Sequence, residues 1–239
     1  MFFLTLYLQH VRDMTPVQTG LMFLAFAIPF ATTSSLAGTI AGKIGARAAT
    51  FAGLTCATAG SLIFATVATD GPLALVGLGF AAFAVGGALA YNGAATSGMS
   101  SVPPAKAGTA SGIQNTLLQL GAAFGLAIAS ALFKAVETDR TTTLLRRAGA
   151  SVTSRDQAEI RGLLSGSDAA QARLRSLAPA AADQVDRIVN GAFMDGFHAA
   201  MVLCLCVGLV AIAAVFLSGR RPAPAPEQQQ PSGQASPAR

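Results

Sequence analysis

The sequence predicts an all-α membrane protein with five complete transmembrane helices. Hydrophobic residues make up 52% of the chain and charged residues only 11%, whereas a soluble domain carries about a quarter charged residues. The apolar runs exceed the ~20 residues that a helix needs to cross a bilayer, and Pro or Gly residues separate them. Within 14–133 the only charged residues are Lys43, Arg47, Asp70 and Lys106.

The first eleven residues, 1–11, are apolar but too few to span a membrane. At 1.5 Å per residue they cover about 16 Å of a hydrocarbon core about 30 Å thick. They lack the basic start and small-residue cleavage site of a signal peptide. We therefore expect a stump, the outer end of a first helix that is truncated in this chain.

Complete spans follow within the membrane region 1–135, and one more lies near the C-terminus. Thr15, Pro16 and Gln18 have the pattern of a capping box with proline at the first helical position, so the first span begins there. Pro29 lies inside this span, where a bundled membrane helix tolerates a kink. The predicted spans are 16–41, 48–69, 72–98, 108–134 and 196–218.

Small residues recur at helix-packing intervals on two of these spans. Gly121 and Gly125 form a GxxxG pattern, and Gly86 and Gly93 are seven residues apart. In lipid, such residues let helix backbones approach closely. We expect these four glycines to lie at contacts between helices. The alternative is that they let one helix slide against another.

The polar segment 136–195 carries eight Arg and eight Asp or Glu residues. It has helical punctuation of its own, including a capping box at 154–157, so we expect a helical insert. The tail 219–239, rich in Pro, Gln, Ala and Ser, is expected to be disordered.

Lys and Arg residues in the short segments favour one orientation. Those at 43, 47, 106, 220 and 221 follow every second predicted span, so they share one side of the membrane. Positive-inside statistics place that side in the cytoplasm. This predicts a multi-pass protein of the cell membrane with a cytoplasmic C-terminus and an extracytoplasmic insert. The net charge of +5 fits this placement better than a nucleic-acid surface.

The segment 38–47, GTIAGKIGAR, resembles the loop signature that follows the second helix of each half in the major facilitator superfamily. Segment 101–119 and the FMDGFH sequence at 193–198 are similar to fourteen-span multidrug efflux transporters of the EmrB/QacA type. The resemblance implies the C-terminal six-helix half of a major facilitator fold. It further implies secondary active export of hydrophobic or cationic compounds, driven by protons, together with a missing N-terminal half and without cofactors.

The same resemblance makes Gly38, Lys43, Gly45 and Arg47 a candidate gating loop. The family carries an acidic residue where this chain has Gly42, which removes one expected contact. Gly45 permits a sharp turn, and the cations hold the loop at the inner face. Alternatively, these residues only determine topology.

Polar uncharged residues at bilayer depth are candidates for a substrate cavity: Tyr91, Asn92, Asn115 and Gln119. The alternative is that they bond across helices, for ~1 kcal/mol or less. The predicted spans contain no Asp or Glu at bilayer depth, so we expect a proton-coupling carboxylate to belong to a part outside this chain.

An enzyme or a metal site has no supporting residues. His10 and His198 have no acidic cluster beside them, and the three Cys lie in apolar runs, where such residues act as small hydrophobes. No hydrolase elbow, zinc-protease motif or phosphate loop occurs. The alternative to a transporter half is a non-transporting membrane scaffold or a degenerate transporter fragment.

Overall fold

The computed structural model describes residues 1–68, 71–100, 102–147 and 185–218. The regular structure of these residues is entirely helical. The elements are α1 (Phe2–Leu6), the π-helical turn η1 (Tyr7–Val11), α2 (Pro16–Met22), α3 (Leu24–Ile44), α4 (Ala46–Ala65), α5 (Leu73–Ser100), the 3-10 turn η2 (Pro104–Lys106), α6 (Ala107–Arg147) and α9 (Val185–Ser218).

Five stretches of the described residues are long and apolar enough to cross a membrane: Pro16–Ile44, Ala46–Ala65, Leu73–Ser100, Pro104–Leu144 and Asn190–Ser218. The predicted all-α membrane fold is therefore confirmed. The first stretch combines α2 and α3, which are interrupted only at Phe23. The predicted capping box is present, because Thr15 and Gln18 bond each other's backbone N–H groups. Pro29 does not end α3.

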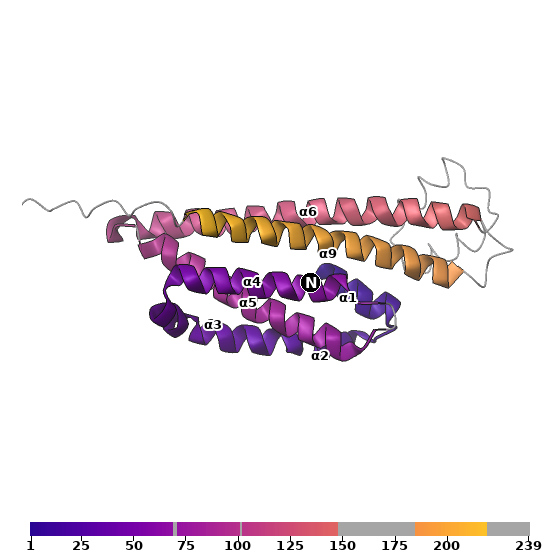
Figure 1. Ribbon diagram of the computed structural model, residues 1–239, viewed down its shortest axis with the longest axis horizontal. Helices are drawn as coiled ribbons and strands as arrows, with labels where there is room; N and C mark the ends of the chain where they lie inside the picture. Colours follow the sequence, from indigo (N-terminus) through magenta and orange to yellow (C-terminus); the bar gives the residue numbers. More distant parts are fainter. Residues whose placement is uncertain (69–70, 101, 148–184, 219–239) are drawn as a thin grey trace, which may run out of the picture.

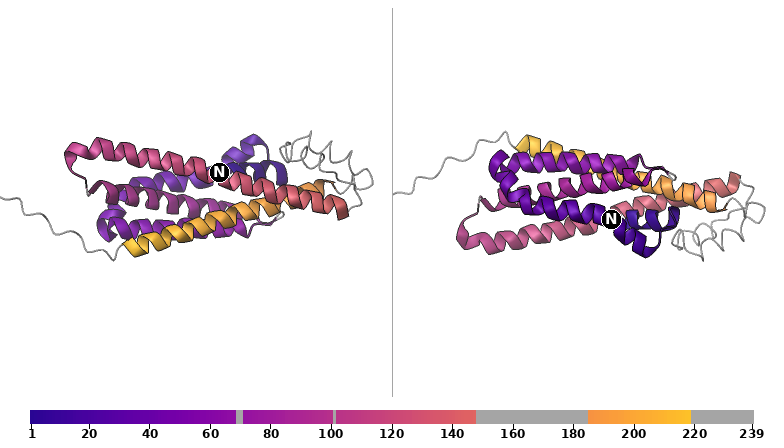
Figure 2. Two further views of the ribbon diagram at one scale, coloured as in Figure 1. Left: turned by 90° about the horizontal axis from the view of Figure 1, so that it is seen from above. Right: turned by 90° about the horizontal axis from the view of Figure 1, so that it is seen from below.

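The helices form two adjoining groups (Figures 1 and 2). α6 and α9 run side by side, and α5 packs against both α3 and α4. α4 also contacts α9 and so joins the two groups. We name the two ends of the bundle by residues found there. The Gly45 end holds the α3–α4 junction and the C-terminus of α9, and the Phe197 end holds the first turns of α5.

Glycines bring α4 and α5 into backbone contact. A Cβ atom at Gly86 would lie 2.6 Å from the Gly53 carbonyl oxygen, and one at Gly93 would lie 2.9 Å from the Ala46 carbonyl oxygen. On α4, a Cβ atom at Gly60 would lie 2.7 Å from the Phe83 nitrogen. These separations leave no room for a side chain, so the two helices depend on glycine to pack as they do.

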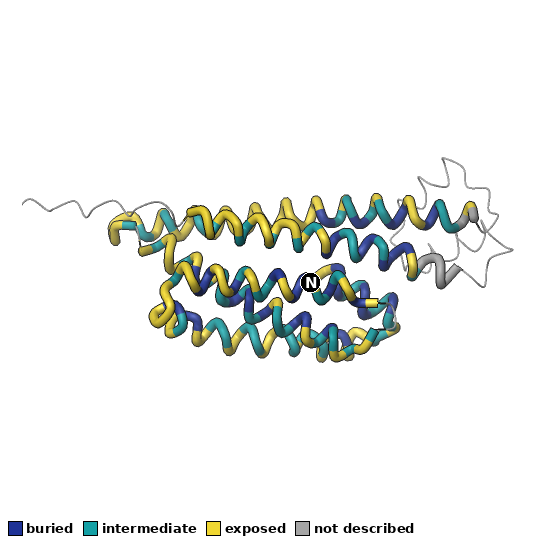
Figure 3. Tube along the Cα trace, viewed as in Figure 1, coloured by how far each residue is buried: buried dark blue, intermediate teal, exposed yellow. Residues whose placement is uncertain are grey.

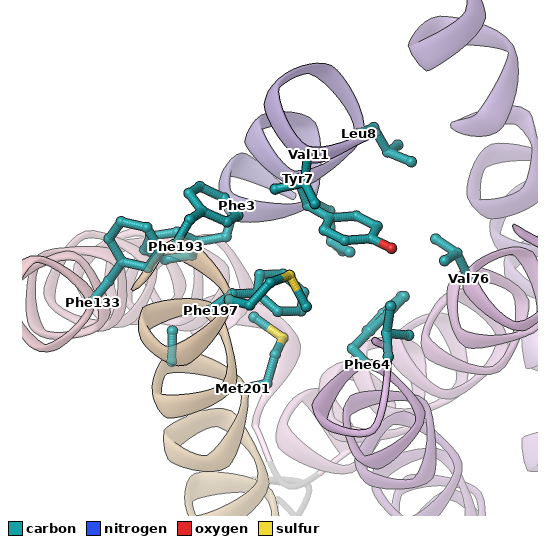
Figure 4. Packing of buried hydrophobic residues seen from close by; sticks show 14 of the residues in the cluster. Phe3, Tyr7, Leu8, Val11, Phe64, Val76, Phe133, Phe193, Phe197 and Met201 are labelled. Carbon is teal, nitrogen blue, oxygen red and sulfur yellow. The ribbon is translucent and has the colours of Figure 1, made fainter. Parts of the chain in front are cut away.

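The N-terminal segment lies at the centre of the core at the Phe197 end (Figure 4). Tyr7 and Leu8 of η1 are fully buried. The Tyr7 ring stacks on Phe197 of α9 at 5.5 Å between centroids, and Phe3 lies 5.0 Å from Phe133 of α6. Residues of α4 and α5 complete the same cluster. This short segment therefore packs against four long helices, and each aromatic pair adds about 0.5–1.5 kcal/mol beyond burial.

α4 ends at Ala65 and not at 69 as predicted. The carbonyl groups beyond it are bonded by side chains of other elements. His198 Nε2 lies 2.8 Å from the Val67 oxygen, Tyr7 donates to the Ala68 oxygen at 3.2 Å, and Arg12 donates to the Gly71 oxygen at 2.9 Å. A carbonyl oxygen only accepts, so His198 Nε2 carries the proton. These bonds replace the helical ones that the chain gives up there.

α6 continues past the predicted limit of 134 to Arg147, and α9 begins at Val185. The first and last residues of the predicted insert therefore extend these two helices. At 1.5 Å per residue, α6 is about 60 Å long, twice a hydrocarbon core of about 30 Å. Arg140 Nε lies 3.2 Å from Asp195 Oδ2 and joins the two extensions. The capping box at 154–157 and the tail 219–239 lie outside the described residues.

Exposed residues recur along the helices of the bundle (Figure 3). Many of them have large apolar side chains. Val17 is 74% exposed, Phe124 67% and Val210 69%. A soluble protein would bury such residues, whereas lipid tails solvate them. Faces of this kind are suited to contact with the lipid bilayer.

Candidate functional site

The α3–α4 junction is a single residue, Gly45, with φ 88° and ψ 142°. Its N–H donates to the Ala41 oxygen at 2.8 Å, and its carbonyl accepts from the Ala49 N–H at 3.0 Å. It therefore ends one helix and begins the next. A side chain on an L-residue disfavours this φ, which explains glycine at the position.

Arg47, in the first turn of α4, reaches the other end of the chain. Its Nη2 donates to the Phe216 oxygen at 2.9 Å and to the Val215 oxygen at 3.0 Å, and its Nε donates to the Val215 oxygen at 3.3 Å. Both acceptors lie in the last turn of α9, which ends at Ser218. The loop and the last helix are thus joined by a charged side chain.

The other two residues of the predicted gating loop lie apart from this contact. Gly38 and Lys43 are exposed near the end of α3. No atom lies within 4 Å of a Cβ atom built at Gly38, and the same holds for Gly42. Within the described residues, the structure therefore brings Arg47 to α9, places Gly45 at the α3–α4 junction, and leaves Gly38 and Lys43 exposed on α3.

The polar residues predicted to line a cavity are not gathered in one place. Asn92 on α5 donates to Ser34 Oγ on α3 at 3.2 Å and to the Ala88 oxygen at 2.8 Å. It thus makes the bond between helices that the sequence left open as an alternative. Tyr91 is 50% exposed. Asn115 and Gln119 are exposed on α6, and in the described part of the chain no hydrogen bond joins the four.

An apolar hollow of about 360 Å³ lies where α4, α5, α6 and α9 meet. Its walls are mostly aliphatic or small, with Phe83 on one side, and Thr58, Ser61 and Cys204 supply the few polar atoms. None of the four polar candidates lines it. A hollow of this composition accommodates an apolar group and offers little to a charged one.

Gly121 and Gly125 do not pack against another described helix, contrary to the sequence-based expectation. No atom lies within 4 Å of a Cβ atom built at either position. Gly125 borders the apolar hollow instead. The close contact of α9 with α4 uses Gly208, which lies against Thr58. No described residue thus covers the face of α6 that carries the GxxxG pattern.

Glu137 is an acidic residue that the sequence did not single out, because it fell within the predicted insert. It is only 2% exposed on α6. Its Oε2 lies 3.4 Å from Lys134 Nζ, and its Oε1 is buried without a hydrogen-bond partner. The absence of Gly and Pro from 134–147 could have placed it in the helix. Among the described residues, no three metal-binding side chains lie together.

The helices and their lipid-facing surfaces define a multi-pass α-helical membrane protein. The sequence model of the Major Facilitator Superfamily matches residues 1–126, and the chain belongs to this superfamily of membrane transporters.

Several relatives are resistance proteins. The multidrug resistance protein Stp of Mycobacterium tuberculosis is 39% identical over 133 residues, which are 55% of this chain and 24% of that protein. The tetracenomycin C resistance and export protein of Streptomyces glaucescens is 27% identical over 238 residues, or 95% of this chain and 43% of that protein. The lincomycin resistance protein of Streptomyces lincolnensis is 32% identical over 130 residues, or 53% and 26%. The chain spans less than half the length of these relatives.

Proposed function

We propose that this chain is the C-terminal half of a fourteen-span multidrug efflux transporter of the EmrB/QacA type. The observation that carries the proposal is the match of 95% of this chain to 43% of an export protein. A major facilitator transporter holds its substrate between two halves that rock against each other. The face of α6 at Gly121, which no described residue covers, suits packing against helices of the other half.

The proposed substrates are hydrophobic or cationic compounds exported by a secondary active mechanism. The apolar hollow of about 360 Å³ supports the hydrophobic class, because it buries an apolar group among side chains from four helices. The names of the matched relatives, which concern antibiotic resistance, point the same way.

Coupling to inward proton flow is part of the proposal. Buried acids in membrane proteins are costly and take part in proton relays. Glu137, whose Oε1 is buried and unpartnered, is the carboxylate of the described residues that best suits this role. This part of the proposal differs from the expectation that such a carboxylate belongs to a part outside this chain.

The proposed transporter resides in the cell membrane with its C-terminus in the cytoplasm. A single cysteine at Ser165, in a background without the three native cysteines, should then react with an impermeant maleimide on intact cells. A cysteine at Ser232 should react only after the cells are permeabilised. Labelling of Ser232 but not Ser165 on intact cells would reverse the orientation.

Transport in proteoliposomes tests the proposed function. We expect the 239-residue chain alone to show no accumulation of a fluorescent cationic dye under a pH gradient. The same chain extended by its upstream coding region should accumulate it, and Glu137→Gln should reduce that accumulation more than tenfold, since glutamine cannot exchange a proton.

Two results would contradict this proposal. Gradient-driven uptake by the chain alone would exclude a half transporter. Failure of the extended protein with a panel of hydrophobic and cationic dyes would favour the non-transporting scaffold instead.

A further inference from the structure

We propose that Arg47 is a positioning residue that locks the C-terminal end of α9 to the α3–α4 junction, so that these elements move as one unit. The hydrogen bonds between Arg47 and α9 can be tested without any transport activity. The effect of this lock on transport rests on the proposed function.

Arg47 binds the last described turn of α9 through two carbonyl oxygens. The described part of α9 runs to Ser218. Nη2 of Arg47 donates to the oxygens of Val215 and Phe216, and Nε donates to the oxygen of Val215. Hydrogen bonds from a charged donor are stronger than neutral ones, so this one side chain attaches α9 firmly to the first turn of α4.

The positive charge of Arg47 interacts favourably with the dipole of α9 and unfavourably with the dipole of α4. It is the second residue of α4, where the positive end of the helix dipole disfavours a cation. The C-terminus of α9 has the opposite polarity and stabilises a cation. The position of Arg47 is therefore unfavourable for its own helix and favourable for the last one.

The geometry calls for a guanidinium group. Nε and Nη2 both donate, and between them they reach two successive carbonyl oxygens at 2.9–3.3 Å. Arginine presents such donors in a fixed planar fork, whereas lysine has one ammonium on a flexible stem. Lysine at this position should hold the end of α9 only in part.

Neighbouring contacts connect the lock to the rest of the bundle. Arg47, Thr50 and Ser97 line a hollow of about 340 Å³ together with Val215 and Ser218. Gly93 of α5 lies against Thr50 of α4, next to the lock. The end of α9 is thus fastened to a part of α4 that is itself packed tightly on α5.

Hydrogen–deuterium exchange of the chain in lipid nanodiscs tests the lock. We expect Arg47→Gln to speed exchange in the last turn of α9, 212–218, about tenfold, because hydrogen bonds from a charged donor are lost. Exchange around Phe197 should not change. Arg47→Lys should give an intermediate rate, and Lys43→Gln, an exposed cation of the same loop, should behave like the unaltered chain.

Unaltered protection of 212–218 in Arg47→Gln would overturn the proposal. Equal loss of protection along all of α9 would overturn it too, because Arg47 would then support the fold generally. In the extended transporter, Arg47→Gln should lower the maximal transport rate without changing the half-saturating substrate concentration. Since exchange needs no transport, failure of the proposed function would not be mistaken for failure of the lock.

Discussion

Gly86→Val should prevent α4 and α5 from packing and leave little of the chain correctly folded. A Cβ atom at Gly86 would lie 2.6 Å from the Gly53 carbonyl oxygen and even closer to the Ala57 nitrogen. Both are backbone atoms of α4, so no side chain can rotate to make room. The helices would have to separate, which also opens the neighbouring contacts at Gly60 and Gly93.

Ordinary overpacking of a core costs about 1–3 kcal/mol. We expect Gly86→Val to lower the free energy of unfolding by about 3 kcal/mol or more, at the upper end of this range or beyond it. The total stability of a folded domain is only about 5–15 kcal/mol. The measurement is size-exclusion chromatography of the variant in nanodiscs after heating. We expect its monodisperse peak to disappear at a temperature at least 10 °C below that of the unaltered chain, or to be missing from the start.

Gly87→Val is the matched control, because it adds the same side chain at the next position of α5. No atom lies within 4 Å of a Cβ atom built there. Its melting temperature should stay within about 3 °C of the unaltered chain, since a surface substitution changes stability by roughly 0.5 kcal/mol. Equal behaviour of the two variants would show that α4 and α5 do not pack through Gly86.

The sequence predicted the spans because membrane insertion depends on local composition. Long stretches without charge predict a helix wherever they lie in the chain, and the described structure has five such stretches. The spacing of Gly86 and Gly93 likewise predicted a helix contact, because seven residues are two turns of one helix. Their partners on α4 could not be deduced, since that depends on which helices become neighbours.

Tertiary contacts also explain the predictions that differed from the structure. The prediction of a stump at 1–11 rests on length alone, and length could not show that Tyr7 and Leu8 are fully buried among other helices. Gly121 and Gly125 have the pattern of a packing face, but no described helix covers them.

The length of α6 could have been predicted from local sequence. No Gly or Pro lies between Phe133 and Arg147, so hydropathy falls while the helix continues. Using the end of the apolar run as the end of the helix excluded Glu137 from consideration. Among the candidate loop residues, the family resemblance indicated Arg47, but only the fold reveals Val215 and Phe216 as its acceptors.

Gly45→Val should destabilise the chain by about 3 kcal/mol and release Arg47 from α9. Gly45 has φ 88° and ψ 142°, a region that is essentially closed to β-branched residues and costs about 1–3 kcal/mol even for smaller ones. Relief of this strain requires a different φ, which would reorient the first turn of α4. Arg47 would then no longer reach the two carbonyl oxygens.

The contrast with neighbouring substitutions makes this prediction specific. Ala46→Val adds the same bulk at a helical position, and Gly42→Ala adds a Cβ atom where no atom lies within 4 Å. Gly42→Ala should stabilise the chain by up to about 1 kcal/mol, because alanine is the better helix former. Only Gly45→Val should both lower the melting temperature and speed hydrogen exchange at 212–218. Exchange at 212–218 that stays slow in Gly45→Val would show that the junction can change its backbone angles without moving Arg47, and that the turn does not position the lock.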